Sequence, residues 1–168
     1  LDAKGKSEPV AAFRLVGLVE GAEFIPRRLD SPLVGRKNEL AQLQRAYDHA
    51  ASERVAYQFT LLGAAGIGKS RLVRELEDRV DATLLAGRCL PYGEGITYWP
   101  IVEVLQQLDV RPNNPSAAAV IRSLLGEAEA ATSAEEIAWA FRKTLESAAT
   151  DRTLVVVFDD IQWGEETF

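Results

Sequence analysis

The stretch Leu61–Val73, "LLGAAGIGKSRLV", sets three glycines and two alanines between an apolar run and a helix-forming run. Within it, Gly63–Ser70 reads GAAGIGKS and matches the pattern G-x-x-x-x-G-K-[ST] in full. Glycines leave backbone N–H groups uncovered and permit the φ values that a loop wrapping a ligand requires. The stretch therefore predicts a strand, a phosphate-binding loop at Gly63–Ser70 (the P-loop) and a helix.

The P-loop residues have separate expected roles. The first turn of the following helix offers unsatisfied N–H groups and partial positive charge, which favour phosphate. Lys69 adds a full charge toward the β- and γ-phosphates, and the Ser70 hydroxyl is expected to ligate Mg²⁺. The residues expected to contact the nucleotide here are Gly63, Ala64, Ala65, Gly66, Ile67, Gly68, Lys69, Ser70 and Arg71.

A second signal lies 90 positions after Lys69, in a pair of acids. Thr153–Phe158, "TLVVVF", is apolar at both alternating sets of positions, which predicts a central parallel strand covered on both faces. It delivers Asp159 and Asp160 at the strand's carboxyl end, where doubly wound sheets bind ligands. We expect Asp159 to hold Mg²⁺ and Asp160 to orient or deprotonate an attacking water. The alternative is that the two acids merely end a strand at the surface.

Hydrophobic periodicity and turn residues predict the remaining elements. Strand, helix, strand, helices, strand is an α/β order, so the predicted fold is a P-loop NTPase with a partial parallel sheet flanked by helices. Ser133 and Glu136 form an expected capping box. The predicted strands are Ala11–Gly21, Val55–Leu62, Ala82–Leu90 and Thr153–Phe158, and the predicted helices run from Asn38 to Ser52, after Lys69, from Pro100, and near Ala117–Leu125 and Ala134–Ala149.

Composition excludes several classes of site. The net charge is −6, and residues 101–168 carry 5 Lys and Arg against 12 Asp and Glu, so nucleic-acid binding is disfavoured. Cys89 and His49 are the only residues of their types, which excludes an intrachain disulfide and a Cys/His metal site. We interpret Cys89 as buried and His49 as a helix-surface residue. No apolar run approaches the roughly 20 residues that span a bilayer, so a cytoplasmic protein is expected.

Four ordered blocks resemble a known family: "PLVGRKNELAQL" (Pro32–Leu43), "GAAGIGKSRLVREL" (Gly63–Leu76), "GRCLPYGEGITYWPIVEVL" (Gly87–Leu105) and "LVVVFDDIQWGEE" (Leu154–Glu166). Together they resemble the signal-transduction ATPases with numerous domains (STAND), which are AAA-like P-loop proteins of large bacterial regulators. The resemblance implies that residues 31–168 are the N-terminal part of such an ATPase domain.

The resemblance also implies roles for single residues. It places the segment Leu33–Arg36 against the adenine and ribose, with Val34 and Gly35 as the expected base contacts and Arg36 as a further candidate. The family often has His, Trp, Ala and Asp after the paired acids, where this chain has Gln162, Trp163, Gly164 and Glu165. This chain therefore has the family's tryptophan, at Trp163, but has Gln162 in place of the histidine, and the role of Gln162 is open.

The segment Leu1–Leu18, "LDAKGKSEPVAAFRLVGL", resembles the closing segment of a class III adenylate or guanylate cyclase domain. Residues 1–30 are thus interpreted as the tail of a preceding cyclase-like domain with a linker. The cyclase's metal-binding and base-reading residues would lie upstream, so no cyclase activity is assigned. The chain begins with Leu1, which we interpret as the start of a fragment.

The predicted function is binding and hydrolysis of Mg-ATP as a switch in a signalling or transcription regulator. The expected partners are other domains of the same polypeptide, and an unpaired sheet edge predicts self-association. ATP is preferred to GTP because no Asn/Thr-Lys-x-Asp motif occurs. The open alternatives are a nucleotide-binding module without turnover, a small-molecule or nucleotide kinase, and a scaffold that binds no nucleotide. The resemblance implies that hydrolysis also uses elements beyond the paired acids, so binding without turnover stays an open alternative.

Overall fold

The computed structural model describes residues 33–90, 97–128 and 132–165. The chain divides between Ser31 and Pro32 into two units, and all the described residues belong to the second. The predicted strand at Ala11–Gly21, the connector after it and the cyclase-like segment lie outside the described residues.

Six helical segments and two strands make up the described part, and most match their predicted positions. Ser133 and Glu136 form the expected capping box, with the Ser133 side chain accepting from the Glu136 amide and the Glu136 side chain accepting from the Ser133 amide. The elements are α1 (Lys37–Glu53), α2 (Lys69–Glu77), β1 (Thr83–Arg88), α3 (Trp99–Gln106), α4 (Pro115–Leu124), α5 (Ala134–Ala148), β2 (Leu154–Asp159) and the short 3-10 helix η1 (Ile161–Trp163).

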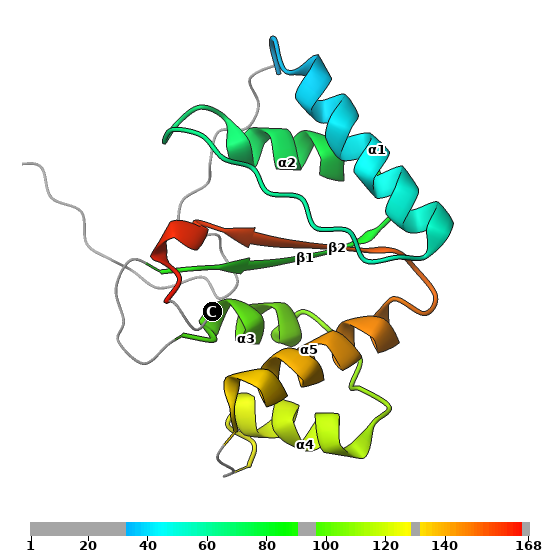
Figure 1. The fold of residues 1–168 in the computed structure, drawn as a ribbon, viewed down its shortest axis with the longest axis vertical. Helices are drawn as coiled ribbons and strands as arrows, with labels where there is room; N and C mark the ends of the chain where they lie inside the picture. Colours follow the sequence, from blue (N-terminus) through cyan, green and yellow to red (C-terminus); the bar gives the residue numbers. More distant parts are fainter. Residues whose placement is uncertain (1–32, 91–96, 129–131, 166–168) are drawn as a thin grey trace, which may run out of the picture. The chain divides into compact units, whose positions relative to one another are not determined.

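The two strands pair in parallel, which confirms the predicted arrangement for this part of the sheet. The register runs from Thr83 opposite Leu154 to Arg88 opposite Asp159. Both strands therefore end at the same edge, and the residues that follow them are neighbours in space. Figure 1 shows β1 and β2 side by side with their arrowheads pointing the same way.

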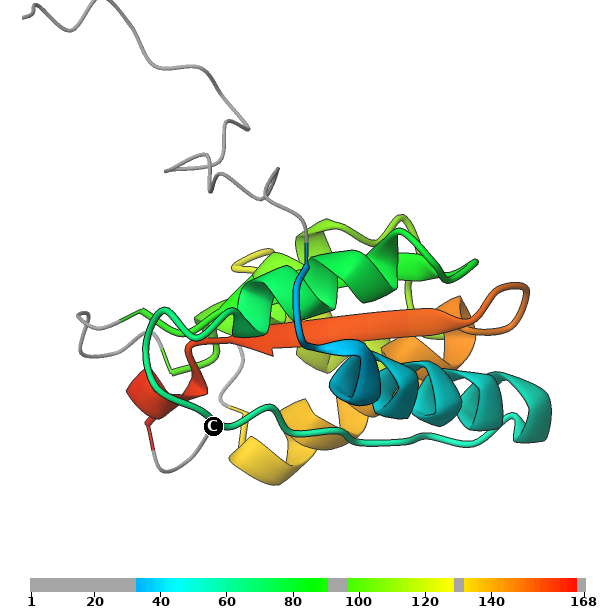
Figure 2. The same ribbon diagram turned by 90° about the horizontal axis from the view of Figure 1, so that it is seen from above.

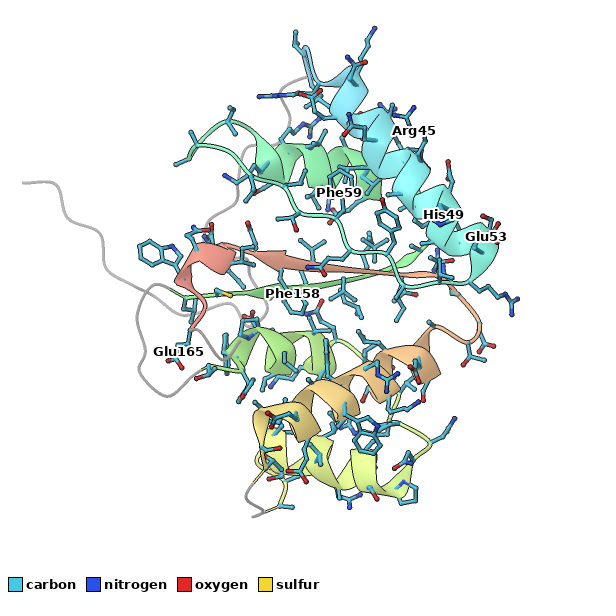
Figure 3. All side chains as sticks on the ribbon, viewed as in Figure 1. Arg45, His49, Glu53, Phe59, Phe158 and Glu165 are labelled. Atoms are coloured by element: carbon cyan, nitrogen blue, oxygen red, sulfur yellow. The ribbon has the colours of Figure 1, made fainter. Side chains whose placement is uncertain are left out.

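Helices lie on both sides of the strands (Figures 1 and 2). On one side, α1 and α2 pack against each other through Leu40, Leu43, Leu72 and Leu76. On the other side, α3 and α5 cover the strands, and α5 also packs against α4. Phe158 of β2, labelled in Figure 3, contacts Phe141 of α5, with ring centroids 6.2 Å apart.

Alternate residues of β2 point to these two layers. Leu154, Val156 and Phe158 belong to the apolar cluster built with α3 and α5. Since successive side chains of a strand point to opposite faces, Asp159 faces the layer that contains α2. The strand thus delivers its terminal carboxylate toward the helix that begins with the P-loop lysine.

The outer edge of β1 is closed by two side chains of α3 and the residue after it. Gln107 accepts from the Ala86 amide at 3.0 Å and donates to the Ala86 carbonyl at 2.6 Å, as a neighbouring strand would. Glu103 accepts from the Arg88 amide at 2.7 Å. These contacts satisfy backbone groups that an edge strand otherwise leaves open.

One predicted strand is absent from the structure. Val55–Leu62 has no strand conformation, and its large side chains are exposed, with Val55 47%, Tyr57 56% and Phe59 41% accessible. A strand forms when its backbone groups meet those of a neighbour, and in the described chain β1 and β2 pair only with each other. Although this stretch is rich in β-forming residues, it therefore has no neighbouring strand to pair with in the described chain. Figure 3 labels Phe59 on this stretch.

The last strand has helices on both faces, as predicted, but in the described chain it lies at an edge of the sheet rather than at its centre. All six residues of β2 are half-buried, because β2 pairs on one edge only. The interpretations of the two single-copy residues are confirmed: Cys89 is 3% exposed, and His49 lies on the exposed surface of α1.

Candidate functional site

The P-loop has the backbone that its glycines predict. Gly66 has φ 75° and Gly68 has φ 99°, both in the left-handed region that L side chains rarely adopt. Gly68 is the N-cap of α2, and its carbonyl accepts the first helical hydrogen bond, from the Leu72 amide at 3.0 Å. The loop therefore leads directly into a helix N-terminus, a position at which proteins commonly bind anions.

The Lys69 side chain folds back over the start of its own loop. Its Nζ donates to the carbonyls of Gly63 at 2.9 Å and Ala64 at 3.2 Å. These contacts place the ammonium group against the loop rather than in bulk solvent. Residues 62–68 are exposed, so the loop's surface is open to a ligand.

Ser70 and Asp159 come together although 89 positions separate them in the sequence. The Ser70 hydroxyl lies 3.4 Å from Asp159 Oδ2, in a partly buried position. The other oxygen, Oδ1, accepts from the Asp160 amide at 3.0 Å, which orients the carboxylate. A hydroxyl and a carboxylate are the oxygen donors that Mg²⁺ prefers, so this pair fits the predicted metal position. Among the described residues, no group of three or more His, Cys, Asp or Glu side chains is arranged to hold a metal ion.

Asp160 faces a different partner from Asp159. Its backbone is left-handed, with φ 57° and ψ 36°, so the chain turns sharply just after β2. Arg88 donates to Asp160 Oδ2 through Nε at 2.9 Å and through Nη2 at 2.6 Å. Gln162 donates to Asp160 Oδ1 at 3.3 Å. The structure thus gives a contact to Gln162, whose role was open in the sequence.

Arg88 is the residue of this site that the sequence interpretation missed. The hydrogen bond to Asp160 raises the pKa of its guanidinium, and the charge of Asp160 adds to the effect. The available signal was its place near the end of the predicted strand Ala82–Leu90, since parallel strands end at a common edge. The pairing of that strand with β2 was not evident from the sequence.

The segment before α1 reaches the P-loop through Arg36. Its guanidinium lies 3.4 Å from the Ile67 carbonyl and pairs with Glu39 at 2.8 Å. Val34 is 81% exposed, and Gly35 has φ 74°. Arg71, the last of the expected nucleotide contacts, pairs with Glu75 at 3.1 Å.

Arg71 also lines an open groove of about 720 Å³ between α1 and α2. Val34 and Gly35 do not line it, although Leu33 does. The groove is bordered by Leu33, Lys37, Leu40, Ala41, Gln44, Arg71, Glu75 and Arg79.

Within the described ranges, no helix has the length and apolarity needed to cross a bilayer.

Comparisons with known proteins identify the family of the chain. The family model described as "AAA ATPase domain" matches residues 32–167. The chain is similar to a protein of Rhizobium meliloti (strain 1021) named "Uncharacterized protein R02095", with 32% identity over 127 residues. That match covers 71% of this chain and 12% of the relative, so the chain spans about an eighth of the relative's length. No solved structure matches at a significant level. With a family model matching from residue 32 to residue 167, this chain belongs to the AAA ATPase domain family.

Proposed function

We propose that this chain binds Mg-ATP and hydrolyses it as a switch within a larger signalling or transcription regulator. The observation that carries the proposal is the approach of Ser70 to Asp159, which joins the start of α2 to the end of β2. The family match supports nucleotide binding. The regulatory setting is supported by the four sequence blocks that resemble STAND ATPases and by the much greater length of the relative.

The binding half of the proposal rests on three groups of this chain. The P-loop amides and the N-terminus of α2 would receive the phosphates, and Lys69 would exchange its carbonyl contacts for phosphate oxygens. Ser70 and Asp159 would hold Mg²⁺. When bound, Mg²⁺ neutralises phosphate charge and orients the phosphates for displacement. Val34 and Gly35 remain proposed base contacts, next to Arg36 and its Ile67 contact.

The hydrolysis half assigns a role to Asp160. A carboxylate at the end of β2, one residue from the proposed metal ligand, is suited to orient a water for attack on the γ-phosphate. A second candidate function, binding without turnover, is favoured by one observation: both Asp160 oxygens already accept hydrogen bonds, from Arg88 and Gln162. A carboxylate restrained in this way is also compatible with a structural role.

Replacing Asp160 with Asn separates the two candidate functions in the intact protein. If the chain hydrolyses ATP through Asp160, Asp160→Asn lowers phosphate release by about 100-fold or more, within the range for general-base groups. Its affinity for a fluorescent ATP analogue should remain within about two-fold, because the phosphate contacts are untouched. Asp151→Asn, on an exposed turn before β2, is the matched control. Equal phosphate release by wild type and Asp160→Asn would overturn the hydrolytic assignment.

A further inference from the structure

Arg88 and Asp160 link the carboxyl ends of the two strands. Arg88 is the last residue of β1, and Asp160 directly follows β2. Two guanidinium nitrogens reach a single carboxylate oxygen, Nη2 at 2.6 Å and Nε at 2.9 Å. Hydrogen bonds between ionised groups are shorter and stronger than neutral ones, and these distances fall in that class.

The backbone beneath Arg88 is held on both sides. Toward β2, Arg88 is in register with Asp159, and the next amide, that of Cys89, donates to the Asp159 carbonyl at 3.1 Å. On the outer side, the Arg88 amide donates to Glu103 of α3. The neighbouring Gly87 lies so close to α3 that an added Cβ would stand 2.2 Å from the Pro100 carbonyl oxygen. The backbone that carries the Arg88 guanidinium is therefore held in place from both sides.

The backbone and the side chain of Asp160 are also restrained. Its left-handed backbone turns the side chain out of the line of β2, and only a few residue types adopt that conformation readily, Asp among them. Arg88 fixes Oδ2, and Gln162 contacts Oδ1 from η1. Both ends of the carboxylate are thus oriented by residues from different elements.

An exposed ion pair between two mobile side chains contributes little to stability. The Arg88–Asp160 pair differs in that both backbones are fixed and the Asp160 side chain is 26% exposed, although the Arg88 side chain is 50% exposed. Its main physical effect is therefore on the orientation of Asp160. Orientation matters for a carboxylate that handles a water, because the oxygen has to lie within hydrogen-bond reach of the proton it accepts.

We propose that Arg88 is a positioning residue for ATP hydrolysis, which orients the Asp160 carboxylate from the neighbouring strand with Gln162 as a second support. The inference rests on the proposed hydrolytic function of Asp160. It makes Arg88 act through Asp160 rather than on the nucleotide. Loss of Arg88 should therefore change turnover and leave nucleotide binding intact.

The test compares Arg88→Gln and Arg88→Lys in the intact protein. Arg88→Gln should lower kcat for phosphate release by about 10- to 100-fold, the scale of a misplaced catalytic group, with an unchanged Kd for the fluorescent ATP analogue. Arg88→Lys should restore part of kcat, since one ammonium keeps the charge but loses the paired donors. Arg142→Gln, which breaks the exposed pair with Glu146 on α5, is the matched control and should leave kcat unchanged. Unchanged or increased kcat in Arg88→Gln would overturn the inference.

Two further variants distinguish a positioning role from loss of folding. Gln162→Leu removes the weaker contact from the exposed helix η1, and it should lower kcat to a smaller extent while the melting temperature is kept. Arg88→Gln should have no further effect on kcat in the Asp160→Asn background, because residues that act as a unit are not additive. Additive losses in the double variant would contradict the positioning role.

The two proposals can fail separately. If Asp160→Asn hydrolyses ATP like the wild type, the proposed function of Asp160 fails, and this inference fails with it. If Asp160→Asn is inactive and Arg88→Gln hydrolyses ATP normally, only the positioning role of Arg88 fails.

Discussion

Ser70 and Asp159 are 89 positions apart in the sequence, yet the Ser70 hydroxyl lies 3.4 Å from an Asp159 carboxylate oxygen. Ser70 is the second residue of α2, and Asp159 is the last residue of β2. The contact joins the two motifs that were identified separately in the sequence, the P-loop and the paired acids. It also defines where Mg²⁺ is expected when ATP is bound.

Changing this pair should remove the Mg²⁺ dependence of nucleotide binding. Asp159→Asn deletes the ionic oxygen donor, and we expect the gain in ATP affinity on adding Mg²⁺ to fall by about 10-fold or more. Ser70→Ala should act in the same direction. Titration of a fluorescent ATP analogue with and without Mg²⁺ measures the effect. A full Mg²⁺ response in both variants would place the metal elsewhere.

Lys69 should be required for affinity whether or not hydrolysis occurs. Lys69→Ala removes the ammonium group beside the P-loop, and charge-assisted hydrogen bonds of this kind correspond to about 10- to 100-fold in affinity. Lys143→Ala is a matched control, because that lysine pairs with Glu146 on α5. The measurement is equilibrium binding of the ATP analogue, and equal affinities for Lys69→Ala and wild type would contradict the P-loop assignment.

Gly87 should tolerate no side chain. A Cβ at this position would lie 2.2 Å from the Pro100 carbonyl oxygen and 2.8 Å from its carbonyl carbon, both backbone atoms. Separating α3 from β1 to relieve this clash should destabilise Gly87→Ala by about 1–3 kcal/mol, the range for overpacking. Leu84→Ala on the same strand, where the side chain is 38% exposed, should cost less. Denaturant unfolding monitored by tryptophan fluorescence compares the two, and a Gly87→Ala variant as stable as wild type would refute the predicted clash.

Cys89 should be protected from thiol reagents in the folded protein. It is 3% exposed, and burial raises the pKa of its thiol, with added effects from the charges of Asp160 and Glu103. We expect labelling at pH 8 to be at least about ten-fold slower than in denaturant, since the thiolate is the reactive form.

The pH dependence of this protection has a definite sign. Because the folded state binds the thiol proton more tightly than the unfolded state, this group's contribution lowers stability as pH rises through the ordinary thiol pKa of about 8.5. Because the native thiol has the higher pKa, its labelling rate should still be rising with pH where the labelling rate of the unfolded thiol has already levelled off. Equal rates of labelling with and without denaturant at pH 8 would show that Cys89 is accessible.

Local chemistry determined a large part of this protein from sequence alone. The glycine spacing of Gly63–Ser70 specifies a loop with positive φ at Gly66 and Gly68. Amphipathic spacing and the Ser133–Glu136 capping box specify helices that appear within a few residues of their predicted bounds. These features depend on residues close together along the chain, so their signals are contained in short stretches.

Only the tertiary structure decided which distant segments meet. Val55–Leu62 has the composition of a strand, but it forms none because no partner strand is available to it within the described residues. Arg88 became part of the site because β1 ends beside β2, a pairing that brings together residues 72 positions apart. Strand pairing depends on backbone hydrogen bonds between segments that are remote in the sequence. The composition of a strand therefore does not determine which other strand it pairs with.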